Sequence, residues 1–158
     1  MSEPGPTEQT AGDTAVGLFE SGYNCAEAIV RALAPSALRE VPALQRVATA
    51  FGAGIARRGL TCGCLTGCAI AAGLRLGRTV PDDEMSKEIT YGVVEEVMDR
   101  FAATFGTFDC RALTGVDFTQ AIAPEEKQRV MTQTCRGLVR FVAEVGAEAI
   151  AAAVKEEA

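Results

Sequence analysis

Six cysteines carry the reactive chemistry available to this chain, because it contains no histidine. Without histidine, Ser–His and Cys–His catalytic pairs, histidine-ligated metals and an imidazole general base are excluded. Cysteine thiolates can instead bind soft metals, attack disulfides or be oxidised. The sequence therefore limits these residues to metal ligation, thiol redox chemistry or inert burial. They are Cys25, Cys62, Cys64, Cys68, Cys110 and Cys135.

Three of the cysteines directly follow a residue type that commonly caps helices. This pattern predicts that each cysteine occupies the first position of a helix, where backbone N–H groups are free and the helix dipole is positive. Both features stabilise a thiolate and lower the pKa of the thiol. The pairs are Asn24-Cys25, Thr61-Cys62 and Asp109-Cys110.

The other three cysteines lack this context. Cys135 lies within a predicted helix among apolar residues, which suggests a core position. Beside three thiolates, however, it could be the fourth ligand of a tetrahedral zinc site or an iron–sulfur cluster. Cys64 and Cys68 are four residues apart, so they share a helix face. Cys62 lies about 200° around the helix axis from Cys64. We expect Cys64 and Cys68 to be core residues or a secondary thiol pair, with ligation of one centre by all three as the alternative.

Charge and composition exclude several classes of function. The net charge is −6 and the pI about 4.8, which argues against binding to nucleic acid or anionic membranes. The acidic start of the chain has no apolar run, and apolar stretches elsewhere are too short to span a membrane, so we expect a cytoplasmic protein. Arg57 and Arg58 precede the cysteine motif and suggest a solvated loop, or alternatively a site that holds an anion or offsets cluster charge.

We expect the elements that position the cysteines to be helices, because no stretch of useful length alternates apolar and polar residues as a strand would. We predict an all-α, compact bundle of about six helices, formed by a single domain at 13–158 behind a flexible tail at 1–12. The central helix should be the Ala- and Gly-rich one that follows the Thr61-Cys62 cap, with Leu74 on its buried side. The predicted helices run over 14–20, 24–33, 42–51, 62–76, 81–105 and 124–155, with a short turn at 110–113.

Several strings of the sequence resemble the C-GCAxxG-C-C family of redox-active bacterial and archaeal proteins. The resemblance extends over roughly residues 14–145, and its motifs occur in the family's order. They are Gly22-Tyr23-Asn24-Cys25-Ala26-Glu27, Phe51-Gly52-Ala53-Gly54-Ile55, Thr61-Cys62-Gly63-Cys64-Leu65-Thr66-Gly67, Phe105-Gly106, Asp109-Cys110-Arg111-Ala112-Leu113-Thr114-Gly115 and Cys135.

The resemblance implies a site formed by the family's four cysteines, which correspond to Cys25, Cys62, Cys110 and Cys135. The family often has alanine where this chain has Cys64 and Cys68. Because a related cytochrome domain is associated with an iron–sulfur cluster, the resemblance implies electron transfer or redox sensing by an accessory protein rather than a stand-alone enzyme.

Three functions remain open at this stage. The first is a cluster of the [2Fe–2S] type held by Cys25, Cys62, Cys110 and Cys135, with a redox protein as partner. The second is a metal-free thiol–disulfide protein, and the third a zinc or soft-metal module. The Gly- and Ala-rich helices would also allow a homodimer.

Overall fold

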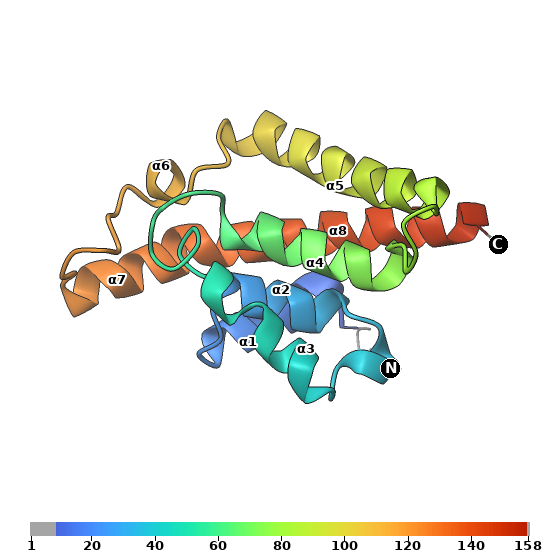
Figure 1. The fold of residues 1–158 in the computed structure, drawn as a ribbon. Coiled ribbons are helices and arrows are strands. Elements are labelled where there is room, and N and C mark those ends of the chain that lie inside the picture. The colour runs from blue at the N-terminus through green and yellow to red at the C-terminus, as the bar shows by residue number, and fades with distance from the viewer. Residues whose placement is uncertain (1–8, 158) are drawn as a thin grey trace, which may run out of the picture.

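The computed structural model describes residues 9–157, and the regular elements in that range are helices (Figure 1). The predicted all-α class is confirmed. The α-helices are α1 (Ala11–Glu20), α2 (Cys25–Leu33), α3 (Pro42–Val47), α4 (Gly63–Leu76), α5 (Glu84–Phe105), α6 (Cys110–Thr114), α7 (Pro124–Val130) and α8 (Arg136–Glu157). Two 3₁₀ turns, η1 (Ser36–Leu38) and η2 (Thr49–Phe51), flank α3, and a π-helical turn, η3 (Met131–Cys135), joins α7 to α8.

Helix α4 is the central helix, as predicted from its small and apolar residues. It contacts α2, α5 and α8, and α1 lies against α2 and α8 (Figure 1). The core between these helices contains Phe101 and Val142, whose side chains are fully buried. No polar or charged residue is buried in the part of the chain that the structure describes. Packing of apolar faces therefore holds the helices together.

Helices α2 and α4 approach each other closely because α4 carries glycine at the contact. A β-carbon added at Gly67 would lie 2.8 Å from the carbonyl oxygen of Ala26 and 3.1 Å from the Cβ of Ile29. No side chain fits this space, so the backbones of the two helices pack directly against each other. This contact lies one turn from the start of α4, where two of the cysteines occur.

The predicted helix ends are correct in several places. Asn24 and Glu27 form a capping box at the start of α2, and Gly106 ends α5 in the left-handed conformation with φ of 79°. The first helix differs from the prediction: Thr10 caps α1, and Asp13 closes the capping box from the third position rather than acting as the cap itself. Helix α1 thus begins inside the expected tail, whose residues 1–8 lie outside the described residues.

The predicted burial of Leu74 is wrong. Its side chain is 37% exposed, whereas that of Leu76 is only 4% exposed. The buried side of α4 follows Cys68 and Ala72, which are four residues apart on one face. Leu74 lies about 200° around the helix from Ala72 and faces outward. Because α4 has small or apolar residues on both its buried and its exposed face, the sequence pattern could not distinguish the two faces.

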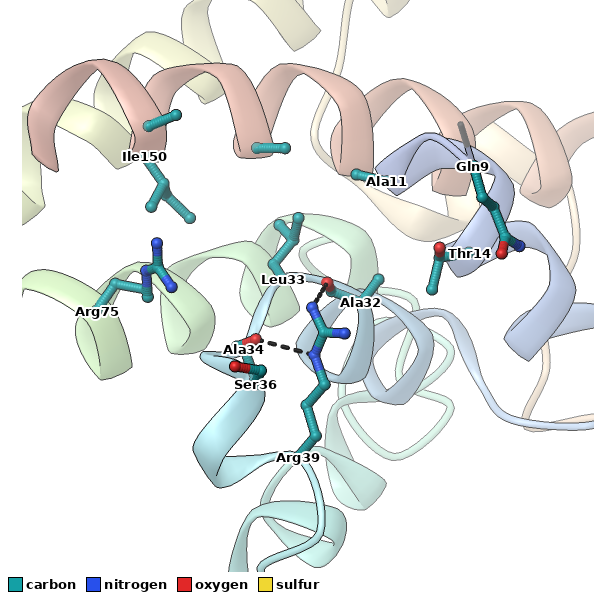
Figure 2. A pocket seen from close by; sticks show the side chains of 12 residues that line it. Gln9, Ala11, Thr14, Ala32, Leu33, Ala34, Ser36, Arg39, Arg75 and Ile150 are labelled. Carbon is teal, nitrogen blue, oxygen red and sulfur yellow. Dashed lines mark hydrogen bonds between the residues drawn. The ribbon is translucent and has the colours of Figure 1, made fainter. Parts of the chain in front are cut away.

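An arginine completes the other end of α2. Arg39 donates hydrogen bonds to the carbonyl oxygens of Ala34 and Ala32, both at 3.1 Å, inside a pocket of about 420 Å³ between α1, α2 and α8 (Figure 2). A cation at the carbonyl end of a helix offsets the negative end of its dipole. Among the helices in the described range, none combines the length and apolar character needed to cross a membrane.

The packing of α2 on α4 predicts a difference between two glycines of the same helix. Gly67→Ala should lower the free energy of unfolding by about 1–3 kcal/mol, because the new methyl group overlaps the backbone of α2. Gly73→Ala, which meets no atom within 4 Å, should raise it by up to about 1 kcal/mol through helix propensity. Urea unfolding of both variants measures the difference. Equal effects of the two substitutions would contradict the close approach.

Candidate functional site

Cys25 occupies the first turn of α2, which its capping box fixes in place. The Asn24 side chain accepts a hydrogen bond from the backbone N–H of Glu27 at 2.9 Å, and the Glu27 carboxylate accepts one from the N–H of Asn24. Both capping side chains also reach η2, since Asn24 Nδ2 donates to the Thr49 carbonyl and Thr49 Oγ1 donates to Glu27. The orientation of Cys25 is therefore set by two segments, α2 and η2.

The loop after η2 has an unusual backbone. Residues 53–57 all have positive φ. One of them is Gly54, and the other four are Ala53 at 52°, Ile55 at 63°, Ala56 at 46° and Arg57 at 70°. Each such residue costs about 1–2 kcal/mol relative to the right-handed conformation. Backbone hydrogen bonds compensate, including Ala56 N–H to the Ala50 carbonyl at 2.8 Å. The sequence predicted only that the helix over 42–51 would end before this loop.

This left-handed loop (Ala53–Arg57) brings a donor to the Cys25 sulfur. The pKa of Cys25 is lowered from its usual 9.0 to about 7, chiefly by a hydrogen bond from the Cys64 thiol. Backbone N–H groups of Ala53, Ala26 and Cys25 itself lower the pKa further, while burial opposes them. A sulfur that accepts several N–H and S–H donors is stabilised as a thiolate.

Cys64 is the protonated partner of this thiolate. Hydrogen bonds to Cys25 and Cys62, together with burial, raise the pKa of Cys64 well above its usual value. The sequence favoured a core position or a pair with Cys68, so its contact with Cys25 was not predicted. The resemblance gave no signal either, because the family's four cysteines do not include this position.

Gly63 allows the starts of α2 and α4 to meet. A β-carbon added at Gly63 would lie 2.5 Å from the Cys25 sulfur and 2.9 Å from the Phe51 carbonyl oxygen. A side chain at this position would thus displace the thiol that the other elements hold in place. The glycine between Cys62 and Cys64 is required for the close approach of Cys25.

Cys62 and Cys110 are fixed near each other by backbone pairing. Thr61 and Asp109 form an isolated antiparallel bridge. The Cys62 N–H donates to the Phe108 carbonyl at 2.8 Å, and the Cys110 N–H donates to the Leu60 carbonyl at 2.7 Å. Both cysteine side chains are buried. The extended loop before α4 and the loop before α6 therefore deliver these two thiols to the same region.

The prediction that Thr61 caps a helix beginning at Cys62 is wrong. Helix α4 begins at Gly63, and Cys62 is itself the N-cap residue, with no side-chain hydrogen bond to the helix. Thr61 is engaged in the bridge to Asp109, so the helix starts one residue later. The same prediction is correct for Cys25 and for Cys110, whose cap Asp109 accepts a hydrogen bond from Ala112 N–H at 2.9 Å.

Cys135 ends the π-helical turn and completes the group. Its pKa is raised to about 12, first by burial and then by negative charge on Cys25, Cys62 and Cys110. The pKa of Cys110 is raised to about 12 by burial and by charge on Cys62 and Cys25. Cys25 and Cys135 line the same cavity, and the Thr61–Asp109 bridge places Cys62 and Cys110 on paired segments. These four cysteines and Cys64 therefore lie at the end of the bundle where α2 and α4 begin.

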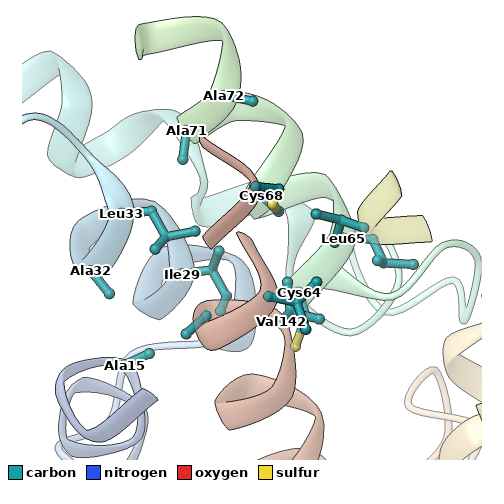
Figure 3. Packing of buried hydrophobic residues seen from close by; sticks show 14 of the residues in the cluster. Ala15, Ile29, Ala32, Leu33, Cys64, Leu65, Cys68, Ala71, Ala72 and Val142 are labelled. Atoms are coloured by element: carbon teal, nitrogen blue, oxygen red, sulfur yellow. The ribbon is translucent and has the colours of Figure 1, made fainter. Parts of the chain in front are cut away.

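Cys68 stands apart from this group. Burial alone raises its pKa to about 12, and no other cysteine contributes. It extends from α4 into the apolar core, where its sulfur lies against Gly146 of α8 (Figure 3). Cys64 and Cys68 share a helix face as expected, but only Cys64 reaches the other thiols.

The gathered thiols do not form a ready metal site. Within residues 9–157, no group of three or more cysteine, aspartate or glutamate side chains is arranged so that it could hold a metal ion. All six cysteines are free thiols rather than disulfides. The six sulfurs are therefore available as thiols.

A cavity of about 390 Å³ opens beside two of the thiols, Cys25 and Cys135. Cys25 is half-buried, so its sulfur is sheltered without being inaccessible. The other described residues that line the cavity are Phe19, Asn24, Thr49, Gly52, Ala53, Ala56, Arg57, Phe118, Lys127 and Met131.

Comparison with known proteins agrees with this geometry. The family model described as "Putative redox-active protein (C_GCAxxG_C_C)" matches residues 23–149. This chain belongs to the C-GCAxxG-C-C family. The match begins just before Cys25 and extends beyond Cys135, so it contains every thiol of this C-GCAxxG-C-C protein. No curated protein and no solved structure matches the chain.

Alkylation of the reduced protein by iodoacetamide should modify Cys25 first, with a rate that reaches half its maximum near pH 7. Cys135 borders the same cavity but keeps its proton up to about pH 12, so it should react much more slowly at neutral pH. Peptide mass spectrometry measures both rates. Similar rates at the two thiols at neutral pH would contradict the stabilised thiolate.

The same thiolate should make stability depend on pH. Because the pKa of Cys25 is lower in the folded protein than its usual 9.0, the thiolate stabilises the fold at alkaline pH. This contribution should be lost as the pH falls through about 7. Urea unfolding across this range measures it, and Cys25→Ser should remove that part of the pH dependence.

Proposed function

We propose that this protein is a thiol-based redox protein in which Cys25 and Cys64 form a reversible disulfide. The observation that carries the proposal is the contact between the starts of α2 and α4, where a β-carbon at Gly63 would lie 2.5 Å from the Cys25 sulfur and Cys64 is the next residue. Each of the two thiols also shifts the pKa of the other, which agrees with a short distance between their sulfurs. The cavity beside Cys25 provides access for an oxidised reactant.

The two thiols have the complementary roles that disulfide exchange requires. The Cys25 thiolate attacks one sulfur of a reactant disulfide, forms a mixed disulfide and releases the other half of the reactant as a thiolate. Once the Cys25 sulfur is bonded, it no longer raises the pKa of Cys64, whereas Cys62 and burial still do. Cys64 then loses its proton to solvent, attacks the Cys25 sulfur and releases the second half of the reactant.

These two steps balance without a metal. The dithiol loses two electrons and the Cys64 proton, one disulfide forms in the protein, and the reactant disulfide is reduced to two thiolates while the proton passes to solvent. The reverse sequence would return the protein to its dithiol form and oxidise a partner. Burial of Cys64 restricts its direct reaction with solutes, so Cys25 is the group that meets the reactant.

A [2Fe–2S] cluster held by Cys25, Cys62, Cys110 and Cys135 is the second candidate. Its support is the gathering of these four thiols from α2, α4, α6 and η3. This candidate is less well supported, because no three side chains among the described residues are arranged as metal ligands. When bound, a cluster would supply one-electron transfer, and zinc on the same residues would supply no redox chemistry.

Variants of the two extra cysteines test the disulfide. Mild oxidation should remove two free thiols from the parent protein and from Cys68→Ser, with the Cys25–Cys64 linkage identified by peptide mass spectrometry. Cys64→Ser should not form this linkage, and its Cys25 should remain a thiol or a mixed disulfide. Cys68 is the matched control because it is buried on the same helix away from the other thiols. Formation of a Cys64–Cys68 linkage instead would overturn the proposal.

Anaerobic metal and sulfide analysis with an optical spectrum tests the second candidate. If a cluster is bound, the protein should be brown with visible charge-transfer bands, and Cys110→Ser should abolish them while Cys64→Ser leaves them intact. Stoichiometric zinc without colour would favour a zinc module. A colourless, metal-free protein that resists reconstitution would rule out both metals.

A further inference from the structure

The cavity beside Cys25 is positively charged, although the protein as a whole carries a net charge of −6. Arg57 and Lys127 line it, and no aspartate or glutamate is among its described lining residues. Neither cation forms an ion pair with any residue in the described part of the chain, unlike Arg136 and Arg140, which pair with Glu20 and Asp13. Two cations without ion-pair partners beside a reactive sulfur favour an anionic reactant.

The same cavity also offers apolar contact. Phe19, Phe118 and Met131 line it together with the two cations. Its volume of about 390 Å³ lies within the range of small-molecule sites and is too small for a folded partner. A reactant that fits should therefore combine a compact apolar part with at least one negative group.

Lys127 and Met131 extend the site to a second hollow. That hollow, of about 440 Å³, shares Phe19, Lys127 and Met131 with the Cys25 cavity. A disulfide has two halves, and two adjoining hollows give each half a space. Glu20 and Arg136 also line the second hollow but pair with each other, so Lys127 is left to interact with charge on either half of the reactant.

We infer that this site accepts an anionic, low-molecular-weight disulfide, such as one with a carboxylate on each half, and that Arg57 and Lys127 select it by charge. This inference rests on the proposed thiol–disulfide function. The Cys25 sulfur bonds to one half of the reactant while the S–S bond breaks and the other half leaves as a thiolate. Cys64 then displaces the bound half, as in the proposed function.

Arg57 connects selection to reactivity through the left-handed loop. It is the last residue of the loop and Ala53 is the first, and both line the cavity together with Cys25. An anion held by Arg57 would therefore lie in the cavity that the Cys25 sulfur faces. The same five-residue loop thus forms part of the wall beside the reactive sulfur and provides one of the two cations.

Three dialkyl disulfides of similar size test the inference. The reduced protein is mixed with dithiodipropionate, hydroxyethyl disulfide or cystamine, which are dianionic, neutral and dicationic. Each rate is divided by the rate of the same reagent with free N-acetylcysteine amide, a thiol without a carboxylate, which removes differences in the leaving thiol. The normalised rate should be highest for dithiodipropionate and lowest for cystamine, and added salt should narrow the difference.

Charge variants assign the selectivity to the cavity. Arg57→Gln and Lys127→Gln should each reduce the preference for dithiodipropionate by roughly two- to fivefold, while Arg57→Lys should retain it. Arg58→Gln is the matched control, because Arg58 adjoins Arg57 in sequence but does not line the cavity. Hydroxyethyl disulfide should react with Arg58→Gln at the same rate as with the parent protein.

The outcomes separate this inference from the proposed function. Equal normalised rates for the three reagents, with the Cys25–Cys64 linkage formed in each case, would overturn charge selection alone. Failure of every reagent to produce that linkage would overturn the proposed function and this inference with it. A preference that Arg58→Gln reduces as much as Arg57→Gln would also overturn the assignment, because it would reflect the general surface field.

Discussion

The close contact between the starts of α2 and α4 is the constraint on which the site depends. At Gly63 and Gly67 the contact has no room for a side chain, so the two backbones approach within van der Waals distance. This approach brings Cys25, at the start of α2, against Cys64, one residue into α4. Longer side chains at these glycines would separate the helices, and the thiol pair would be lost with the packing.

The backbone beside the reactive sulfur is held in a strained, left-handed conformation. Four non-glycine residues with positive φ cost about 1–2 kcal/mol each, a large amount compared with the roughly 5–15 kcal/mol that stabilises a typical domain. Such strain persists only where surrounding interactions determine the conformation. Here the loop's own hydrogen bonds maintain it, and the result is an N–H directed at Cys25 and an arginine beside the cavity.

Local signals in the sequence were sufficient for the helical class, for the caps Asn24 and Asp109, and for the positions of Cys25 and Cys110. These features depend on residues within one helical turn of each other. The sequence could not reveal that Thr61 pairs with Asp109, since that contact joins distant segments. Nor could it separate Cys64 from Cys68 or assign the outer face to Leu74, because α4 has small or apolar residues on every side.

Under the proposed function, Cys64 is the residue that makes a disulfide with Cys25 available to the site. The family often has alanine at this position, and an alanine would remove the principal hydrogen bond to the Cys25 sulfur. The backbone N–H donors would remain, so Cys25 could still be a thiolate or a ligand, but it would have no adjacent thiol on α4 to form a disulfide. With Cys64 present, Cys25 has the second thiol that the proposed two-electron dithiol reaction requires. Ligation of a metal by Cys25 and formation of the disulfide exclude each other, since both use the same sulfur.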